Sequence, residues 1–250
     1  MSKLLLYAYD SNRHHLVAKI NITIYSQIFC ISLFVLSMQL TCQAENLTAA
    51  LDWKIVSSND VITVYEGDKH DSGIVPIKFH AILDYSPSKV RTVLSDTTRR
   101  PEWVPNMVEA RVVERVGVYG KVEYLRYAFP WPFLDRSYVL QTDTSYNPKN
   151  KTLFTQVKSI FHSSIPQNEN YVRAHTYVGT TLTRSEASGK KTYLEAMFLT
   201  DMKGNIPKWI FNNIQQSWPK KIVDNLRQQL SRDDIEVMDK WRLLDIDDEK

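Results

Sequence analysis

The side chains that can do acid–base, nucleophilic or metal chemistry form no known catalytic motif in this sequence. Its 250 residues contain no G-x-S-x-G, H-E-x-x-H, P-loop or G-x-G-x-x-G pattern. After residue 44 the histidines are His70, His80, His162 and His175, and none has a partner at a spacing typical of metal ligands. We therefore predict no catalytic residue, no metal site and no cofactor.

The charge of the chain is nearly balanced. Lys and Arg number 31 against 28 Asp and Glu, which gives a formal net charge of +3. Nucleic-acid-binding domains usually carry a clear basic excess, and the basic pair at 99–100 is not interleaved with aromatic residues. We therefore predict no nucleic-acid partner. The hydrophobic fraction of 43% is that of a globular domain and excludes a disordered or collagen-like chain.

The first 44 residues have the pattern of a secretory signal peptide. An apolar run at 28–38 follows a basic segment, and small residues at Cys42 and Ala44 suit a signal-peptidase site. We predict cleavage after Ala44 and a periplasmic or secreted protein. A retained anchor and an ordinary core helix are the alternatives.

Both cysteines, Cys30 and Cys42, lie in this leader. Residues 45–250 therefore contain no disulfide, no thiol nucleophile and no cysteine-ligated metal. A secreted domain of this length can bury enough surface to fold without disulfides.

Strand-like segments dominate the chain after a short apolar stretch at 47–53, which could be a helix. From Val75 to Leu83 apolar residues occupy every second position, which predicts a strand with one apolar face. Ser86 and Pro87 predict the start of a short helix, because proline suits the first helical turn. Further strands are predicted at 61–65, 107–116, 121–129, 137–144, 152–161, 171–183 and 191–202, with turns at 117–120, 147–150 and 188–190.

The hydrophobic period becomes helical near residue 205. Apolar residues four apart predict a long helix that Asn205 caps and that runs to about Leu230. Pro219 predicts a kink in this helix, with two separate helices as the alternative. The charged segment 231–250 could be a short docked helix or a frayed tail. Many strands and one long helix imply an α+β domain, in which the helix covers one face of a curved antiparallel sheet.

Three segments carry a resemblance to a known family: 97–105, with Trp103 near its end; the proline-rich stretch 127–139; and the strand-to-helix junction 201–210. Together they resemble the START domain, the StAR-related lipid-transfer family. The resemblance implies a helix-grip fold, in which a strongly bent antiparallel sheet wraps around the C-terminal helix and encloses an apolar tunnel for one lipid. We thus expect a signal peptide at 1–44, a START-like domain at 45–230 and a charged tail at 231–250.

The same resemblance suggests polar contacts for a ligand. Some sterol-binding members use a buried acid and a buried arginine in the tunnel. The acid's position falls on or near Glu123, whereas the arginine's falls near Thr142, so Arg126 is the candidate substitute. Arg173 lies in a Val-Arg pair that matches the family. We predict Glu123, Arg126 and Arg173 as ligand contacts; the alternatives are a solvent-facing Glu123 and Arg126 and a structural ion pair at Arg173.

The predicted lid or lining residues on the last helix are Trp209, Ile210, Phe211 and Ile214. A tunnel lining and a solid core face have the same helical spacing, so an ordinary core is the alternative. Trp131 and Phe133 in the proline-rich stretch could meet a membrane surface, since aromatic side chains suit that interface; packing within the loop is the alternative.

We predict a non-catalytic protein that binds and transfers a hydrophobic lipid (a phospholipid, a fatty acid or a sterol) and touches a membrane surface transiently. One alternative is a helix-grip enzyme of cyclase or hydrolase type, for which His80, His175 and Glu123 are the plausible acid–base residues. The other is an interaction module without a cavity.

Overall fold

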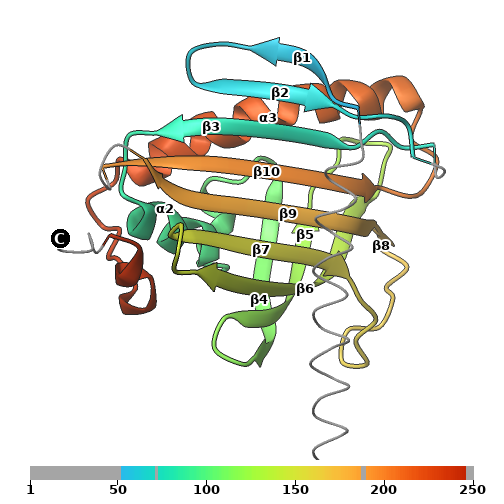
Figure 1. The fold of residues 1–250 in the computed structure, drawn as a ribbon. Helices are drawn as coiled ribbons and strands as arrows, with labels where there is room; N and C mark the ends of the chain where they lie inside the picture. The colour runs from blue at the N-terminus through green and yellow to red at the C-terminus, as the bar shows by residue number, and fades with distance from the viewer. Residues whose placement is uncertain (1–51, 71–72, 187–189, 246–250) are drawn as a thin grey trace, which may run out of the picture. The chain divides into compact units, whose positions relative to one another are not determined.

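The computed structural model describes residues 52–70, 73–186 and 190–245. The expected signal peptide and most of the expected helix at 47–53 lie outside the described residues. The elements follow in this order (Figure 1): β1 Lys54–Ser58, β2 Ile62–Glu66, β3 Ile77–Leu83, α2 Pro87–Ser95, η1 Arg100–Glu102, β4 Met107–Val116, β5 Gly120–Tyr127, β6 Asp135–Asn147, β7 Thr152–Ser159, β8 Tyr171–Arg173, β9 His175–Glu186, β10 Lys191–Asp201, α3 Lys208–Leu230 and η2 Asp239–Leu244.

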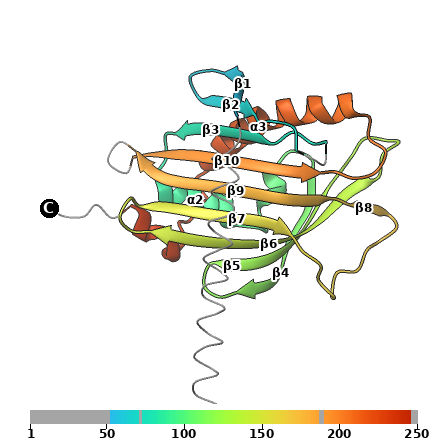
Figure 2. The same ribbon diagram turned by 45° about the vertical axis from the view of Figure 1, so that its right-hand side comes forward.

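The strands of the described region form one sheet in the order β1-β2-β3-β10-β9-β7-β6-β5-β4, and the views in Figures 1 and 2 show these strands side by side. Neighbours along this path are antiparallel, whereas the short β8 pairs parallel with β6. Because β10 returns to pair with β3, the first and last thirds of the domain belong to one sheet. The expected α+β, helix-grip fold is confirmed.

The strand predicted at 171–183 consists of two strands with different partners. β8 pairs with β6, and β9 pairs with β7 and β10. Ala174 stands between them, and its backbone N–H still donates to Ser137 O on β6 at 3.0 Å. A continuous β-pattern predicts extended backbone but not a change of partner.

The short helix α2 begins as its sequence predicts. Ser86 is the N-cap, its hydroxyl accepts from the Lys89 N–H at 3.4 Å, and Pro87 occupies the first turn. Val90 and Val93 are buried on its inner face.

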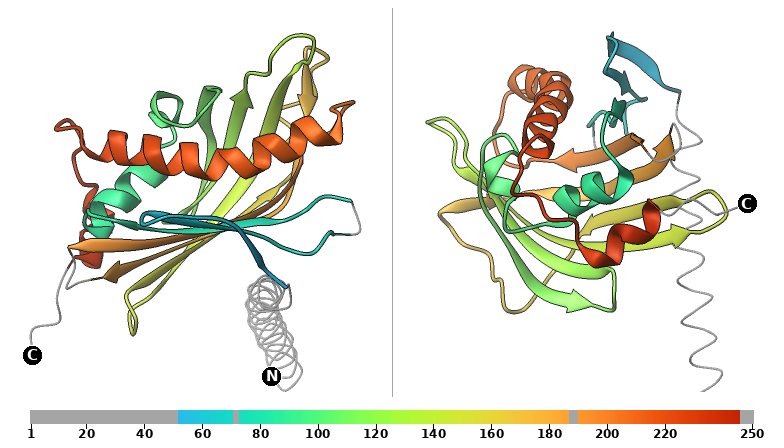
Figure 3. Two further views of the ribbon diagram at one scale, coloured as in Figure 1. Left: turned by 90° about the horizontal axis from the view of Figure 1, so that it is seen from above. Right: turned by 90° about the vertical axis from the view of Figure 1, so that its left-hand side faces the viewer.

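The long helix α3 lies across the concave face of the sheet (Figure 3). It is one continuous helix with Pro219 inside it, as the one-helix interpretation predicted. The expected cap at Asn205 is wrong, because the N-cap is Pro207, which has no side-chain hydrogen bond to offer. Among the described residues no helix is long and apolar enough to cross a membrane.

The main core lies under the C-terminal half of α3. Ile222, Val223, Leu226 and Leu230 are buried there. They belong to one cluster with residues from β2, β3 and α2, which include Val64, Phe79, Leu83 and Val90. This contact fixes one end of α3 against the sheet.

The segment after α3 docks on α2 through the 3₁₀ helix η2. Trp241 and Leu244 are buried, and the Trp241 indole N–H donates to Ser95 Oγ at 2.9 Å. The Asp245 carboxylate accepts from the Ser88 N–H at 2.9 Å. Of the two interpretations for the tail, the docked helix is found as far as residue 245.

Candidate functional site

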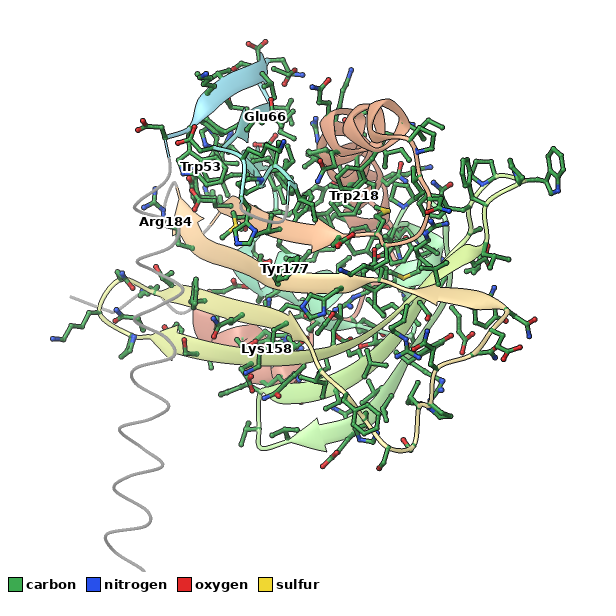
Figure 4. The ribbon with its side chains drawn as sticks, turned by 90° about the vertical axis from the view of Figure 1, so that its right-hand side faces the viewer. Trp53, Glu66, Lys158, Tyr177, Arg184 and Trp218 are labelled. Atoms are coloured by element: carbon green, nitrogen blue, oxygen red, sulfur yellow. The ribbon has the colours of Figure 1, made fainter. Side chains whose placement is uncertain are left out.

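A cavity of about 370 Å³ lies between α3 and the concave face of the sheet. Ligand pockets in proteins usually measure about 300–1,000 Å³. Its wall is mostly apolar, with side chains from β3, β5, β6, β10 and α3, among them Phe79, Leu125, Leu140, Leu194 and Phe198. Trp218 extends from α3 toward the sheet (Figure 4), and its ring centroid lies 5.4 Å from that of Phe198. The space expected beneath the last helix is therefore present.

Strand β5 supplies one wall of this cavity by simple alternation. Lys121, Glu123, Leu125 and Tyr127 line the cavity. Successive side chains of a strand point to opposite faces, so the residues between them lie on the other face, where Val122 and Tyr124 pack in a separate cluster.

Glu123 is the centre of a polar cluster at one end of the cavity. It is 1% exposed. Lys121 Nζ lies 2.8 Å from its Oε1 atom, and Arg100 Nη1 lies 3.2 Å from the same atom. Thr142 Oγ1 donates to Oε2 at 3.1 Å, and the Thr97 hydroxyl donates to Oε1. Arg100 Nη1 also donates to Oε2 at 3.3 Å, so each carboxylate oxygen has at least two donors.

The cations around Glu123 keep it ionised. Burial alone would raise the pKa of this carboxyl, but the charges of Arg100 and Lys121 outweigh burial and hold its pKa well below the usual range. Burial and repulsion from Arg100 in turn lower the pKa of the Lys121 ammonium to about 8, against the opposing attraction of Glu123.

The other end of the cavity is formed by the β5–β6 loop and by the junction that precedes α3. Ala128, Phe129 and Pro130 line it together with Met202 and Phe211. The next residue of the loop, Trp131, is 93% exposed. An exposed aromatic side chain therefore stands beside this end of the cavity.

Arg136 links the chain segments that form this end of the cavity. It is 2% exposed, its Nε donates to Met202 O at 3.2 Å, and its Nη2 donates to Lys203 O at 3.1 Å. Its guanidinium also lies over the Phe129 ring, 4.4 Å from the centroid. The side chain thus joins β6, the β5–β6 loop and the residues before α3.

Of the predicted ligand contacts, Glu123, Phe211 and Ile214 lie on the cavity wall. Ile210, at the first turn of the helix, does not line it. The side chain of Trp209 lies outside the described residues. Whether the wall residues bind a ligand stays a prediction.

The expected placement of Arg126 on the cavity wall is corrected. Its odd spacing from Glu123 on β5 puts it on the opposite face of the strand. There Arg126 Nη1 lies 2.7 Å from Asp135 Oδ2, and its guanidinium lies over the Tyr171 ring. It is a structural ion pair.

The expected placement of Arg173 at the cavity is also corrected. It lies on β8 and lines a separate surface depression, together with Leu134, His175 and Lys203. Its Nη2 donates to Pro166 O at 3.2 Å. β8 lies off the main path of the sheet, where it pairs with β6, and Arg173 is not on the cavity wall.

Sequence reasoning missed the cations that do line the cavity: Arg91 on α2, Arg100 on η1 and Lys121 on β5. For Lys121 a signal existed, because it lies two residues from Glu123 on the same strand face. Arg91 and Arg100 come from helices whose position over the cavity end depends on the tertiary fold.

The histidines proposed for acid–base chemistry lie elsewhere. The His80 ring contacts those of Tyr65 and Tyr193 on the sheet, and the His175 ring contacts Tyr177. In the described part of the chain, the cavity wall contains no histidine. No group of His, Cys, Asp or Glu side chains among the described residues could hold a metal ion.

A bent antiparallel sheet that grips a C-terminal helix over an apolar cavity defines the helix-grip class of proteins. The START domain model matches residues 38–231. The chain belongs to the START domain family.

Several known proteins are similar to this chain. Mouse StAR-related lipid transfer protein 7 is 26% identical over 56% of this chain and 37% of its own length. Mouse acetyl-coenzyme A thioesterase is 21% identical over 72% of this chain and 32% of its own length. The chain thus spans about a third of each relative. The structure of human StAR-related lipid transfer protein 5 superposes with a TM-score of 0.68 at 15% identity, over 78% of this chain and 95% of that one, which shows the shared fold.

Proposed function

We propose that this protein binds a lipid in the cavity beneath α3 and transfers it between membranes without chemical change. The observation that carries the proposal is the cavity itself, which is apolar along most of its wall and charged at one end. An amphiphilic molecule is likewise divided into an apolar part and a polar or charged part. Membership of the START family supports the proposal.

The physical chemistry of lipid exchange explains why the polar end matters. Burying a CH₂ group contributes about 0.8 kcal/mol relative to water, but a membrane buries the same groups equally well. The hydrocarbon part of a lipid therefore gains little on moving from a membrane into the cavity. Selectivity must come from the polar end, where Arg91, Arg100, Lys121 and Glu123 lie.

The membrane contact of this proposal falls on Trp131. Its exposed indole adjoins Pro130, which lines the cavity. Aromatic side chains favour the membrane interface. A lipid would then leave the bilayer beside this loop, and an export signal at 1–44 would place the protein in the periplasm or outside the cell.

An enzyme acting on a hydrophobic substrate is the competing function, and one similar protein is a thioesterase. A general acid or base works best with a pKa near the working pH. Glu123 is held ionised by its cations, and neither His80 nor His175 lines the cavity. These observations support the non-catalytic proposal.

The test is lipid uptake from vesicles. The purified protein is incubated with vesicles that contain phosphatidylcholine, oleic acid and cholesterol, separated by gel filtration, and its organic extract is quantified by mass spectrometry. We expect about one intact lipid per protein and delivery of that lipid to lipid-free acceptor vesicles. No bound lipid after incubation would contradict binding, and hydrolysed phosphatidylcholine in the extract would favour the enzyme.

A further inference from the structure

The charged end of the cavity has an excess of positive charge on buried or partly buried side chains. The strong ionisable groups on the described cavity wall are Arg91, Arg100, Lys121 and Glu123. Three cations therefore face a single carboxylate. Buried charges usually occur in balanced pairs because an uncompensated charge is costly to remove from water. An anionic group in the cavity would balance the charge at this end.

Arg91 is the cation with the least complete set of partners. It is 5% exposed. Its Nη2 donates to the neutral Thr144 hydroxyl at 2.9 Å, and its guanidinium lies over the Trp241 ring. Its Nε is buried without a hydrogen-bond partner. The partners that hold the Arg91 guanidinium are thus neutral, and because Arg91 lines the cavity, a negative charge at this end would stabilise its positive charge.

The other two cations share Glu123 between them. Lys121 and Arg100 both contact Oε1 of that carboxylate. Burial lowers the pKa of Lys121, and repulsion from Arg100 lowers it further. A second negative charge would relieve the repulsion that a single carboxylate leaves.

The position of the cluster sets the direction in which a ligand lies. Lys121 and Tyr127 line the same wall from opposite ends of β5, about 20 Å apart at ~3.3 Å per residue. Tyr127 adjoins the loop that leads to the exposed Trp131. The cluster and the Trp131 loop thus lie at opposite ends of the cavity, and the wall between them is apolar, with Leu125 and Leu140 on it.

We propose that the cavity selects an amphiphile with a net anionic head group, a carboxylate or a phosphate, which lies head-first against Arg91, Arg100 and Lys121 with its hydrocarbon toward the Trp131 loop. This proposal rests on the lipid-binding function proposed above. It excludes a neutral sterol as the preferred ligand, because a hydroxyl supplies no charge to balance the cluster.

The test offers matched anionic and neutral ligands in competition. Oleic acid competes with oleyl alcohol, and dioleoyl phosphatidic acid competes with dioleoylglycerol, each pair equimolar in phosphatidylcholine vesicles with the purified protein. The bound lipids are quantified by mass spectrometry of the re-isolated protein. We expect at least about tenfold preference for the anion in one pair, and the pair that shows it distinguishes a carboxylate from a phosphate.

A variant assigns the preference to the cluster. Arg91→Gln should lower the anionic-to-neutral ratio about tenfold, because it removes a charge-assisted hydrogen bond. Arg111→Gln is the matched control: Arg111 also lies over an aromatic ring, that of Tyr124, but outside the cavity wall. It should leave the ratio unchanged. Circular dichroism checks that both variants fold.

The possible outcomes separate the two proposals. Equal binding of anionic and neutral ligands by the wild type would overturn head-group selection but leave lipid binding intact. Binding of none of the four ligands or of phosphatidylcholine would overturn the lipid-binding function itself. If Arg91→Gln does not fold, the wild-type ratios still decide the question.

Discussion

At the scale of single residues, Glu123 shows how a buried carboxylate can be kept ionised. Removing a carboxylate from water is expensive, and attraction to a cation compensates only where hydrogen bonds satisfy the remaining lone pairs. Glu123 receives contacts from Lys121 and Arg100 and hydrogen bonds from Thr97 and Thr142. Removing the carboxylate would leave three cations together without an anion.

We therefore expect Glu123→Gln to lower the free energy of unfolding at pH 7 by about 3–5 kcal/mol, the usual cost of breaking a buried ion pair from one side. The folded-state pKa of Glu123 is depressed, so its stabilising effect is present above the unfolded pKa and is lost as pH falls through the folded pKa. The difference in free energy of unfolding between the wild type and Glu123→Gln, measured by urea denaturation, should shrink steadily below about pH 4.5.

Glu109→Gln is the control for this prediction. Glu109 also contacts arginines, Arg111 and Arg126, but its side chain is 39% exposed. Exposed ion pairs contribute about 0–1 kcal/mol, so the control should change stability by less than that. A loss for Glu123→Gln no larger than that of Glu109→Gln would show that the buried cluster does not stabilise the fold.

At the residue scale, the family resemblance was enough to predict that Glu123 lies at the cavity, and it does line the wall. Its proposed partner Arg126 was wrong because three residues along a strand reverse the face. The true partner Arg100 comes from a 3₁₀ helix that only the tertiary fold brings to β5.

At the scale of elements, the junction between β10 and α3 determines where the helix begins. Met202 and Lys203 offer their carbonyl groups to Arg136. Gly204 follows with φ +73, a backbone conformation that favours glycine, and an added Cβ there would lie 3.2 Å from Arg136 Nη2. The chain then enters α3 without a side-chain cap.

Gly204→Ala should therefore destabilise the protein by about 2–3 kcal/mol, through backbone strain and displacement of Arg136. Gly117→Ala is a matched control, since Gly117 also has a positive φ, +62, but an added Cβ would meet nothing within 4 Å. It should cost about 1 kcal/mol from strain alone. If urea denaturation shows the same loss of unfolding free energy for Gly204→Ala and Gly117→Ala, the contact with Arg136 does not constrain the junction.

Element types were largely predictable, because period and turn residues are local signals. The Ser86–Pro87 start of α2 and the alternation of β3 are confirmed. The cap at Asn205 failed because an Asn side chain near a helix start predicts a cap only if the backbone turns into the helix there. In this chain the helix begins after Pro207.

At the scale of the whole molecule, the hollow interior is the feature that sequence could not decide. The spacing of Phe211, Ile214 and Trp218 on α3 suits a solid core as well as a cavity wall. A solid core and a cavity differ in the empty volume between helix and sheet, which depends on how far the sheet curves away from the helix. The structure has about 370 Å³ there, and the cavity wall continues along the helix to Ile222 and Leu226, which also belong to the main buried cluster.

The measurement that tests the lipid cavity most directly compares two aromatic substitutions on α3. Ile214 lines the cavity, and Ile210, one turn earlier, does not. Ile214→Trp should fill part of the space and reduce vesicle-to-protein lipid uptake at least about tenfold, with a small change in Tm, because an empty volume accommodates the added ring. Ile210→Trp should take up lipid as the wild type does. Equal uptake by both variants, or a loss of uptake in Ile214→Trp matched by a loss of thermal stability, would contradict a ligand-holding cavity at this place.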